Sequence, residues 1–127
     1  MDQNQLFELY QELQGYMGWD ADDARRILAV KPAVAPAFRG IIDDFYSEIE
    51  KHPAAALAIT GGEQQIERLK TTLLAWLDDL FDGPYDAAFV AKRLRVGRRH
   101  VELGLDAYYT QAALSRIHLH LLDELVD

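Results

Sequence analysis

The chain has 127 residues, half of them hydrophobic and 27% charged, which suits one globular domain with one core. Its formal net charge of -8 disfavours the phosphate backbones of nucleic acids, so we expect no nucleic-acid partner. Cysteine is absent, which excludes disulfides, thiolate metal sites and thiol catalysis. The sequence shows neither a long apolar run nor a signal-peptide pattern at its start, so we expect no membrane insertion and a cytoplasmic location.

Apolar residues at helical spacing predict an all-α fold. Residues 3–14 form a short amphipathic stretch, and Asp20 is placed to cap a second short helix. A stronger apolar stripe predicts a helix over residues 33–51. Pro53 disfavours helical geometry at the residue before it, so this helix should stop at His52.

The second half of the chain predicts three more helices. Two glycines mark a turn before a helix over residues 63–82, and a Gly-Pro pair ends that helix. A helix follows over residues 86–102, with a break at Gly104. The last helix runs from residue 106 to the end, and we find no convincing strand, internal repeat or low-complexity segment.

Several patterns of catalytic chemistry are missing. The chain has no glycine-rich phosphate loop, no metalloprotease His-Glu pattern and no Glu-x-x-His pair of the di-iron bundles. No Ser/His/Asp order stands out. Its many carboxylates are expected to serve as helix caps and solvated faces, so we expect the domain itself to be non-catalytic.

The four histidines differ in what they can do. We expect His52 to be exposed at a helix end, and His118 and His120 point to nearly opposite faces because they are two residues apart on one helix. His100 differs because small residues lie one turn away on each side and leave a flat space beside the imidazole. Those neighbours are Val96, Gly97 and Gly104. From these residues alone, His100 is either a structural histidine or the ligand of a planar cofactor.

The segment RLRVGRRHVELGL, from Arg93 to Leu105, resembles the proximal segment of protoglobins and globin-coupled sensors. That family pattern has a histidine, a hydrophobic residue, any residue, a hydrophobic residue, glycine and leucine. His100 and the five residues after it fill these places, and an aromatic pair follows at Tyr108 and Tyr109. The proline and tryptophan that the family often has in this turn are absent here.

Three upstream segments resemble the same family in the same order. Residues 42–46 (IDDFY) are similar to the helix that carries its distal Phe-Tyr pair, and residues 67–72 (ERLKTT) to its distal helix. Tyr85 and Asp86, followed by Phe89 and Arg93, match the lead into its proximal helix. The resemblance therefore covers roughly residues 30–125.

For the fold, the resemblance implies a globin-like helical sandwich around haem b (iron protoporphyrin IX). It implies a single globin sensor domain over residues 1–127, with N-terminal extension helices over residues 1–29 and the globin core over residues 30–127. The final helix of the family's globin fold is expected to be missing from this chain, which would then be the N-terminal part of a longer signalling protein.

For the site, the resemblance implies that His100 binds the haem iron and that Tyr46 donates a hydrogen bond to the gas. Leu69 and Thr72 would face the gas. Further pocket walls would come from Phe45, Leu73, Phe89 and Val96. The local basic cluster is either a solvated helix face or contributes one side chain that reaches a haem propionate. Its members are Lys92, Arg93, Arg95, Arg98 and Arg99.

For function, the resemblance implies a haem-based sensor of oxygen, or of carbon monoxide or nitric oxide, that regulates a C-terminal output domain. Histidine kinases and diguanylate cyclases are such outputs, and the family pattern also implies a homodimer. Two alternatives stay open. One is a stand-alone haem globin that binds gas or detoxifies nitric oxide, and the other is a haem-free globin-like interaction module.

Overall fold

The structure is a computed structural model that describes residues 2–126, and within that range it contains helices and no strand. The predicted all-α class is therefore confirmed. The helices are α1 (Gln3–Met17), α2 (Ala21–Val34), α3 (Phe38–Glu50), α4 (Pro53–Ala56), α5 (Gly62–Asp82), α6 (Ala87–Glu102) and α7 (Ala107–Leu125). No helix within residues 2–126 has the length and apolarity that a bilayer span requires.

Aspartate side chains cap the N-termini of α2 and α6. Asp20 caps α2 as predicted, because its carboxylate accepts hydrogen bonds from the amides of Asp22 and Asp23. Asp86 caps α6 in the same way through the amide of Phe89. At the other end of α1, Gly18 adopts φ +75°, the left-handed conformation that glycine accepts without strain.

Prolines set the boundaries around α3. The predicted helix over residues 33–51 is divided, because α2 continues to Val34 and a 3-10 turn over Ala35–Ala37 precedes α3. His52 is extended, as a residue before proline should be, so the predicted stop at this point is confirmed. Pro53 then opens the short helix α4, which the sequence analysis did not predict.

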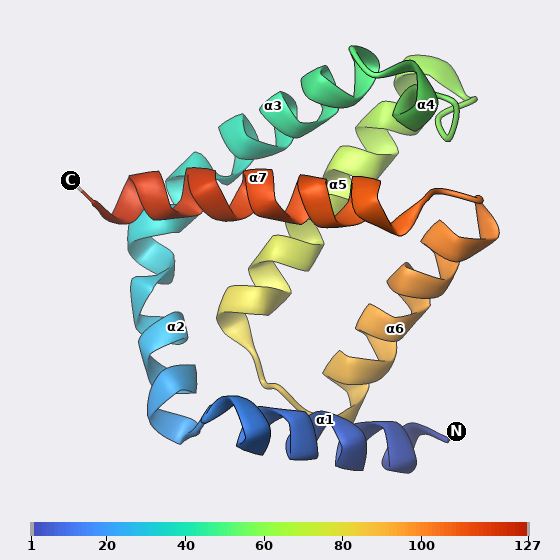
Figure 1. The fold of residues 1–127 in the computed structure, drawn as a ribbon. Helices are drawn as coiled ribbons and strands as arrows, with labels where there is room; N and C mark the ends of the chain where they lie inside the picture. The colour runs from blue at the N-terminus through green and yellow to red at the C-terminus, as the bar shows by residue number, and fades with distance from the viewer. Residues whose placement is uncertain (1, 127) are drawn as a thin grey trace.

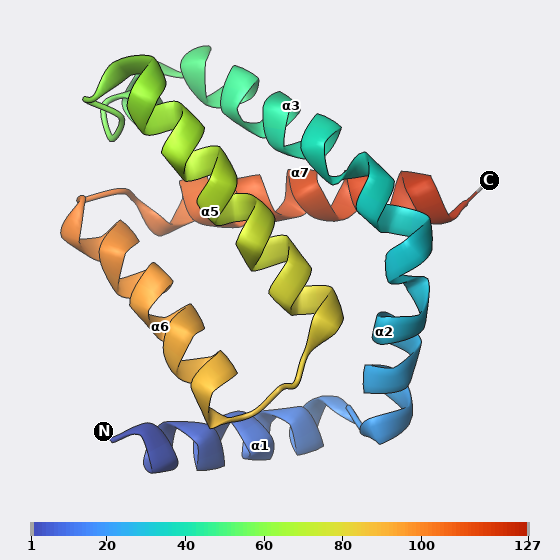
Figure 2. The same ribbon diagram turned by 180° about the vertical axis from the view of Figure 1, so that it is seen from behind.

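In Figure 1, α1 runs along one end of the molecule, α2 and α6 rise from it on opposite sides, and α5 lies between them. Helix α3 packs on α5 and α7, while α2 packs on the same two helices from another side. Helix α6 packs on α1, at the end of the molecule remote from α3, and its Arg93 reaches the carbonyl of Trp76 on α5. Seen from behind in Figure 2, α6 stands beside α5 and is joined to its neighbours by turns at both ends.

One apolar core joins α2, α3, α5 and α7. The tilted rings of Phe38 and Phe81 pack at a centroid separation of 5.6 Å, and Leu77 of α5 is fully buried between these helices. The buried members of this core are Val34, Phe38, Ile41, Ile42, Tyr46, Leu77, Phe81 and Ile117. None of them comes from α6, so the helix that carries His100 lies outside the main core.

Candidate functional site

His100 lies near the end of α6 and its ring is fixed by a backbone contact. Its Nδ1 lies 2.8 Å from the carbonyl oxygen of Val96, one turn earlier. Because a carbonyl can only accept, Nδ1 must carry the proton in this hydrogen bond. The other ring nitrogen, Nε2, then has its lone pair free in the neutral imidazole, which is the arrangement found in most metal-binding histidines.

Two glycines flank His100 in the chain: Gly97 lies within α6 before it, and Gly104 lies in the turn after it. Gly97 is exposed, and a Cβ atom added there would meet no atom within 4 Å. Gly104 has φ +72°, so this position requires glycine. The amide of Leu105 donates to the carbonyl of His100 at 3.3 Å, and that of Gly104 to Val101 at 3.0 Å.

Tyr46, the predicted gas-binding donor, is buried on α3 with 8% of its surface exposed. Its ring meets that of Phe45 edge to face at 4.9 Å. Burial raises the pKa of Tyr46 to about 12, because the phenolate would lose hydration. Within residues 2–126 its hydroxyl has no hydrogen-bonding partner in the protein, so the phenol keeps its proton available.

The predicted residues of α5 divide between two environments. Leu69 and Leu73 are half-buried and pack against the main core with Phe45. Thr72 is exposed, and its hydroxyl donates to the carbonyl of Arg68 at 3.0 Å within its own helix. Its side chain is therefore turned toward a different surface from that of the two leucines.

Thr72 instead lines a small pocket between α5 and α6, together with the predicted wall residues Phe89 and Val96. The pocket has a volume of about 70 Å³ and its exposed lining is almost entirely apolar. Its lining residues are Thr72, Ala75, Trp76, Asp79, Phe89, Lys92, Arg93 and Val96. Trp76 also packs against the main core, so this side chain lies between the two groups of predicted residues.

The structure thus brings the predicted site residues together in two groups rather than one. Tyr46 lies with the first group in the core of α3 and α5, whereas the second group borders the pocket beside α6. His100 follows Val96 of the second group by one turn.

Arg93 is a feature that sequence reasoning named only as one of five cations. Its guanidinium carbon lies 4.1 Å from the ring centre of Trp76 and 4.5 Å from that of Phe89. The burial that this stacking causes could not be read from the sequence. A signal was present, however, because Arg93 precedes His100 by seven residues, which is two helical turns on the same face.

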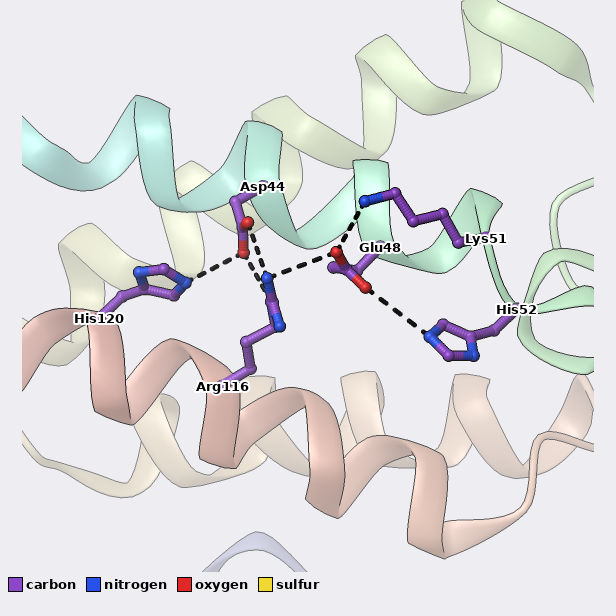
Figure 3. Close-up of polar contacts among 6 residues, drawn as sticks. All are labelled: Asp44, Glu48, Lys51, His52, Arg116 and His120. Carbon is purple, nitrogen blue, oxygen red and sulfur yellow. Dashed lines mark hydrogen bonds and ion pairs between the residues drawn. The ribbon is translucent and has the colours of Figure 1, made fainter.

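Two other histidines belong to a charged network between α3 and α7 that the sequence did not predict (Figure 3). His120 Nε2 lies 3.1 Å from a carboxylate oxygen of Asp44, to which Arg116 also donates. His52 is exposed, as predicted, and lies 3.7 Å from Glu48. His118 is exposed on α7.

No cluster of three or more histidine, aspartate or glutamate side chains in the described part of the chain could hold a bare metal ion. A single imidazole can still hold a metal that arrives within a macrocycle, because the macrocycle supplies the other ligands. His100 offers one such imidazole nitrogen, Nε2.

Comparison with known proteins gives two findings. A family model described as Protoglobin matches residues 8–127. The "Heme-based aerotactic transducer HemAT" of Halobacterium salinarum (strain ATCC 700922 / JCM 11081 / NRC-1) is 30% identical over 112 residues, which are 88% of this chain. The matched region is 23% of the transducer, so the chain spans about a quarter of the length of this relative.

Proposed function

Because the chain belongs to the protoglobin family, we propose that it is a haem-binding gas-sensor domain in which His100 would hold the haem iron. The observation that carries this proposal is the 2.8 Å hydrogen bond from His100 Nδ1 to the Val96 carbonyl, which leaves Nε2 for a metal. The similar protein of Halobacterium salinarum is a heme-based aerotactic transducer, which supports haem binding and sensing for this chain.

The residues present fit a porphyrin in their chemistry. One imidazole is free at Nε2, a largely apolar pocket begins one helical turn away at Val96, and the buried Nε of Arg93 has no hydrogen-bond partner among residues 2–126. The pocket of about 70 Å³ is smaller than the roughly 300–1,000 Å³ typical of small-molecule sites. The proposal therefore requires α6, which lies outside the main core, to move or repack when haem enters.

When bound, haem iron supplies a coordination position for a diatomic gas. Tyr46 would donate its phenolic hydrogen to the gas, and it can do so at physiological pH because its pKa is about 12. Such a hydrogen bond to a partly charged acceptor contributes about 1.5–3 kcal/mol, or roughly one to two powers of ten in affinity. Oxygen should gain most from it, and carbon monoxide less.

The remaining predicted residues would shape the space around the gas. We propose that Phe45, Leu69 and Leu73 limit the entry of water and gas from the core side. Phe89 and Val96 would form walls on the α6 side. Thr72 would be a second polar contact, for which its hydroxyl must leave the carbonyl of Arg68.

We further propose that the cofactor is haem b and that the domain works as a cytoplasmic homodimer linked to an output domain, such as a histidine kinase or diguanylate cyclase. Residues 1–29 would extend a globin core of residues 30–127. A gas can drive such a switch only if it binds two states of the domain with different free energies.

The test is reconstitution of the haem-free protein with haem, followed by absorption spectroscopy. We expect a Soret band that shifts with oxygen or carbon monoxide. His100→Ala should lose haem, whereas His118→Ala, which removes an exposed histidine of α7, should retain it. Added imidazole should restore the spectrum of His100→Gly. Unchanged haem retention in His100→Ala would exclude this ligand.

The small pocket is the observation that favours a second function, a haem-free globin-like interaction module. A protein that remains folded and colourless after haem addition would support that alternative. A stand-alone gas-binding or nitric oxide-detoxifying globin would bind haem in the same experiment, and the gene beyond codon 127 distinguishes it from a linked sensor.

A further inference from the structure

Arg93 of α6 is a half-buried cation without a carboxylate partner. Its guanidinium lies between the rings of Trp76 and Phe89, and its Nη2 donates to the carbonyl of Trp76 at 3.0 Å. Its Nε is buried without a hydrogen-bond partner, and no carboxylate within residues 2–126 lies within ion-pair distance of the guanidinium. Burial lowers the pKa of Arg93, but an arginine stays charged in proteins.

The surroundings of Arg93 leave this charge unbalanced. Asp79 borders the same pocket, but its carboxylate is engaged by Lys92 at 2.6 Å. These three side chains together carry one net positive charge, in a chain whose formal net charge is -8. The rest of the pocket is largely apolar. Such a site suits a flat apolar molecule that carries a carboxylate.

Arg93 also lies at a suitable position relative to His100. Seven residues of α-helix span about 10 Å along the axis and return to the same face. Val96 lies between them on this face and lines the pocket. Gly97, the next residue, has no side chain that could stand between the two positions.

We propose that Arg93 binds a carboxylate of the haem whose iron His100 would hold, and thereby fixes the orientation of the porphyrin. This inference rests on the proposed function. It selects one cation of the basic cluster, because Lys92 is already paired and Arg95, Arg98 and Arg99 are exposed. The aromatic rings on either side of the guanidinium would keep its plane in place for the carboxylate.

The experiment compares haem with its dimethyl ester, in which both carboxylates are blocked. Each is titrated into the haem-free wild type, Arg93→Met, Arg93→Lys and the control Arg95→Met, which replaces an exposed arginine two residues away. Circular dichroism and thermal unfolding of the haem-free proteins first establish that each variant folds.

We expect the wild type to prefer haem over the ester by about tenfold, as one charge-assisted hydrogen bond would give. Arg93→Met should lose this preference with little change in affinity for the ester. Arg93→Lys should keep part of it because the charge remains, and Arg95→Met should match the wild type. A second readout is the circular dichroism of the Soret band, which should change in Arg93→Met if the porphyrin is no longer fixed.

Two results would overturn the inference. One is equal weakening of haem and ester binding in Arg93→Met, which would mean that Arg93 only fastens α6 to Trp76. The other is a wild type that binds both compounds equally, and this arm does not depend on any variant. Failure of haem to bind through His100 would instead remove the proposed function together with this inference, and the His100 variants identify that case.

Discussion

Asp44 of α3 and Arg116 of α7 form a two-point contact. Arg116 Nε donates to Asp44 Oδ2 at 2.7 Å, and its Nη2 donates to Oδ1 at 2.9 Å. His120 approaches the same carboxylate, and Glu48 lies 3.5 Å from the guanidinium (Figure 3). Since Asp44 is two residues before Tyr46, this network fastens the helix of the predicted gas-binding donor to α7.

Replacing Asp44 with Asn should reduce the response of stability to acid. The hydrogen bonds from Arg116 hold the pKa of Asp44 below its usual value. A lowered folded-state pKa gives stability that is present above the unfolded value of about 3.9 and is lost as the pH falls through the folded value. At pH 7 the variant should lose about 1 kcal/mol or less, because the carboxylate is partly exposed.

Urea unfolding of the wild type and Asp44→Asn at pH 7 and pH 3 tests this expectation. Asp123→Asn is a matched control, since Asp123 is exposed on α7. Glu48, whose pKa is lowered chiefly by its hydrogen bond with Lys51, should preserve some acid dependence in every variant. The role of Asp44 would be contradicted if the free energy of unfolding fell by the same amount from pH 7 to pH 3 in Asp44→Asn and in the wild type.

Replacing Tyr46 with Phe should change gas binding more than it changes the stability of the fold. The hydroxyl has no protein partner within residues 2–126, so the haem-free variant should unfold within about 0.5 kcal/mol of the wild type. In the haem-loaded protein, oxygen should leave about 10 to 100 times faster, and carbon monoxide should be affected less. Stopped-flow dissociation rates for the two gases decide this, and equal changes for both would argue against the hydrogen bond.

The oxygen affinity should also show no titration of Tyr46 between pH 6 and pH 10. Burial raises the pKa of this phenol to about 12, so it remains a donor throughout that range. Oxygen titrations of the wild type and Tyr46→Phe across this range should therefore give parallel pH profiles. A tyrosine-dependent loss of affinity near pH 8 would show that the phenol ionises far earlier than its burial implies.

The fold was predictable because its determinants are local. Asp20 and Pro53 mark helix boundaries through the hydrogen-bonding and steric properties of their own segments. The short helix α4 was missed because four residues, Pro53–Ala56, are too few to show an apolar period. The division around the 3-10 turn was missed because the apolar stripe continues through it.

The site was predictable only in part, because it depends on side chains from different helices. The spacing around His100 predicted a space beside the imidazole, and this stays a prediction because Gly97 is exposed and borders solvent. The sequence could not indicate that Thr72 bonds within its own helix or that Arg93 is held between two aromatic rings. Asp44 and Arg116 are 72 residues apart, and no local pattern predicts such a pair.

Truncation of Leu77 to Ala should destabilise the fold strongly. Leu77 is fully buried at the centre of the main core, so its removal leaves a cavity as well as losing apolar contact. The cost should be about 2–5 kcal/mol. Leu57→Ala removes a leucine that is 79% exposed and should cost less than about 0.5 kcal/mol. Chemical denaturation measures the free energy of unfolding of both variants. Similar losses of stability in the two would contradict the placement of Leu77 in the core.

Truncation of Tyr10 to Ala should loosen α6 in particular. Tyr10 of α1 is half-buried and its ring lies 6.5 Å from that of Phe89. The loss should be about 1–2 kcal/mol, since only part of the side chain is buried. Hydrogen exchange should then speed up in α6 more than in α5. Tyr16→Ala is the control, because that tyrosine is 89% exposed in the same helix; equal exchange in both variants would contradict the role of α1.

The turn after His100 has a mechanical consequence. Four residues, 103–106, separate α6 from α7, and the amides of Gly104 and Leu105 are bonded back to Val101 and His100. The imidazole-bearing residue is thus connected to the last helix by a short hydrogen-bonded corner rather than by a slack linker. A tilt of the His100 backbone would be passed directly to the first turn of α7, without any intermediary side chain.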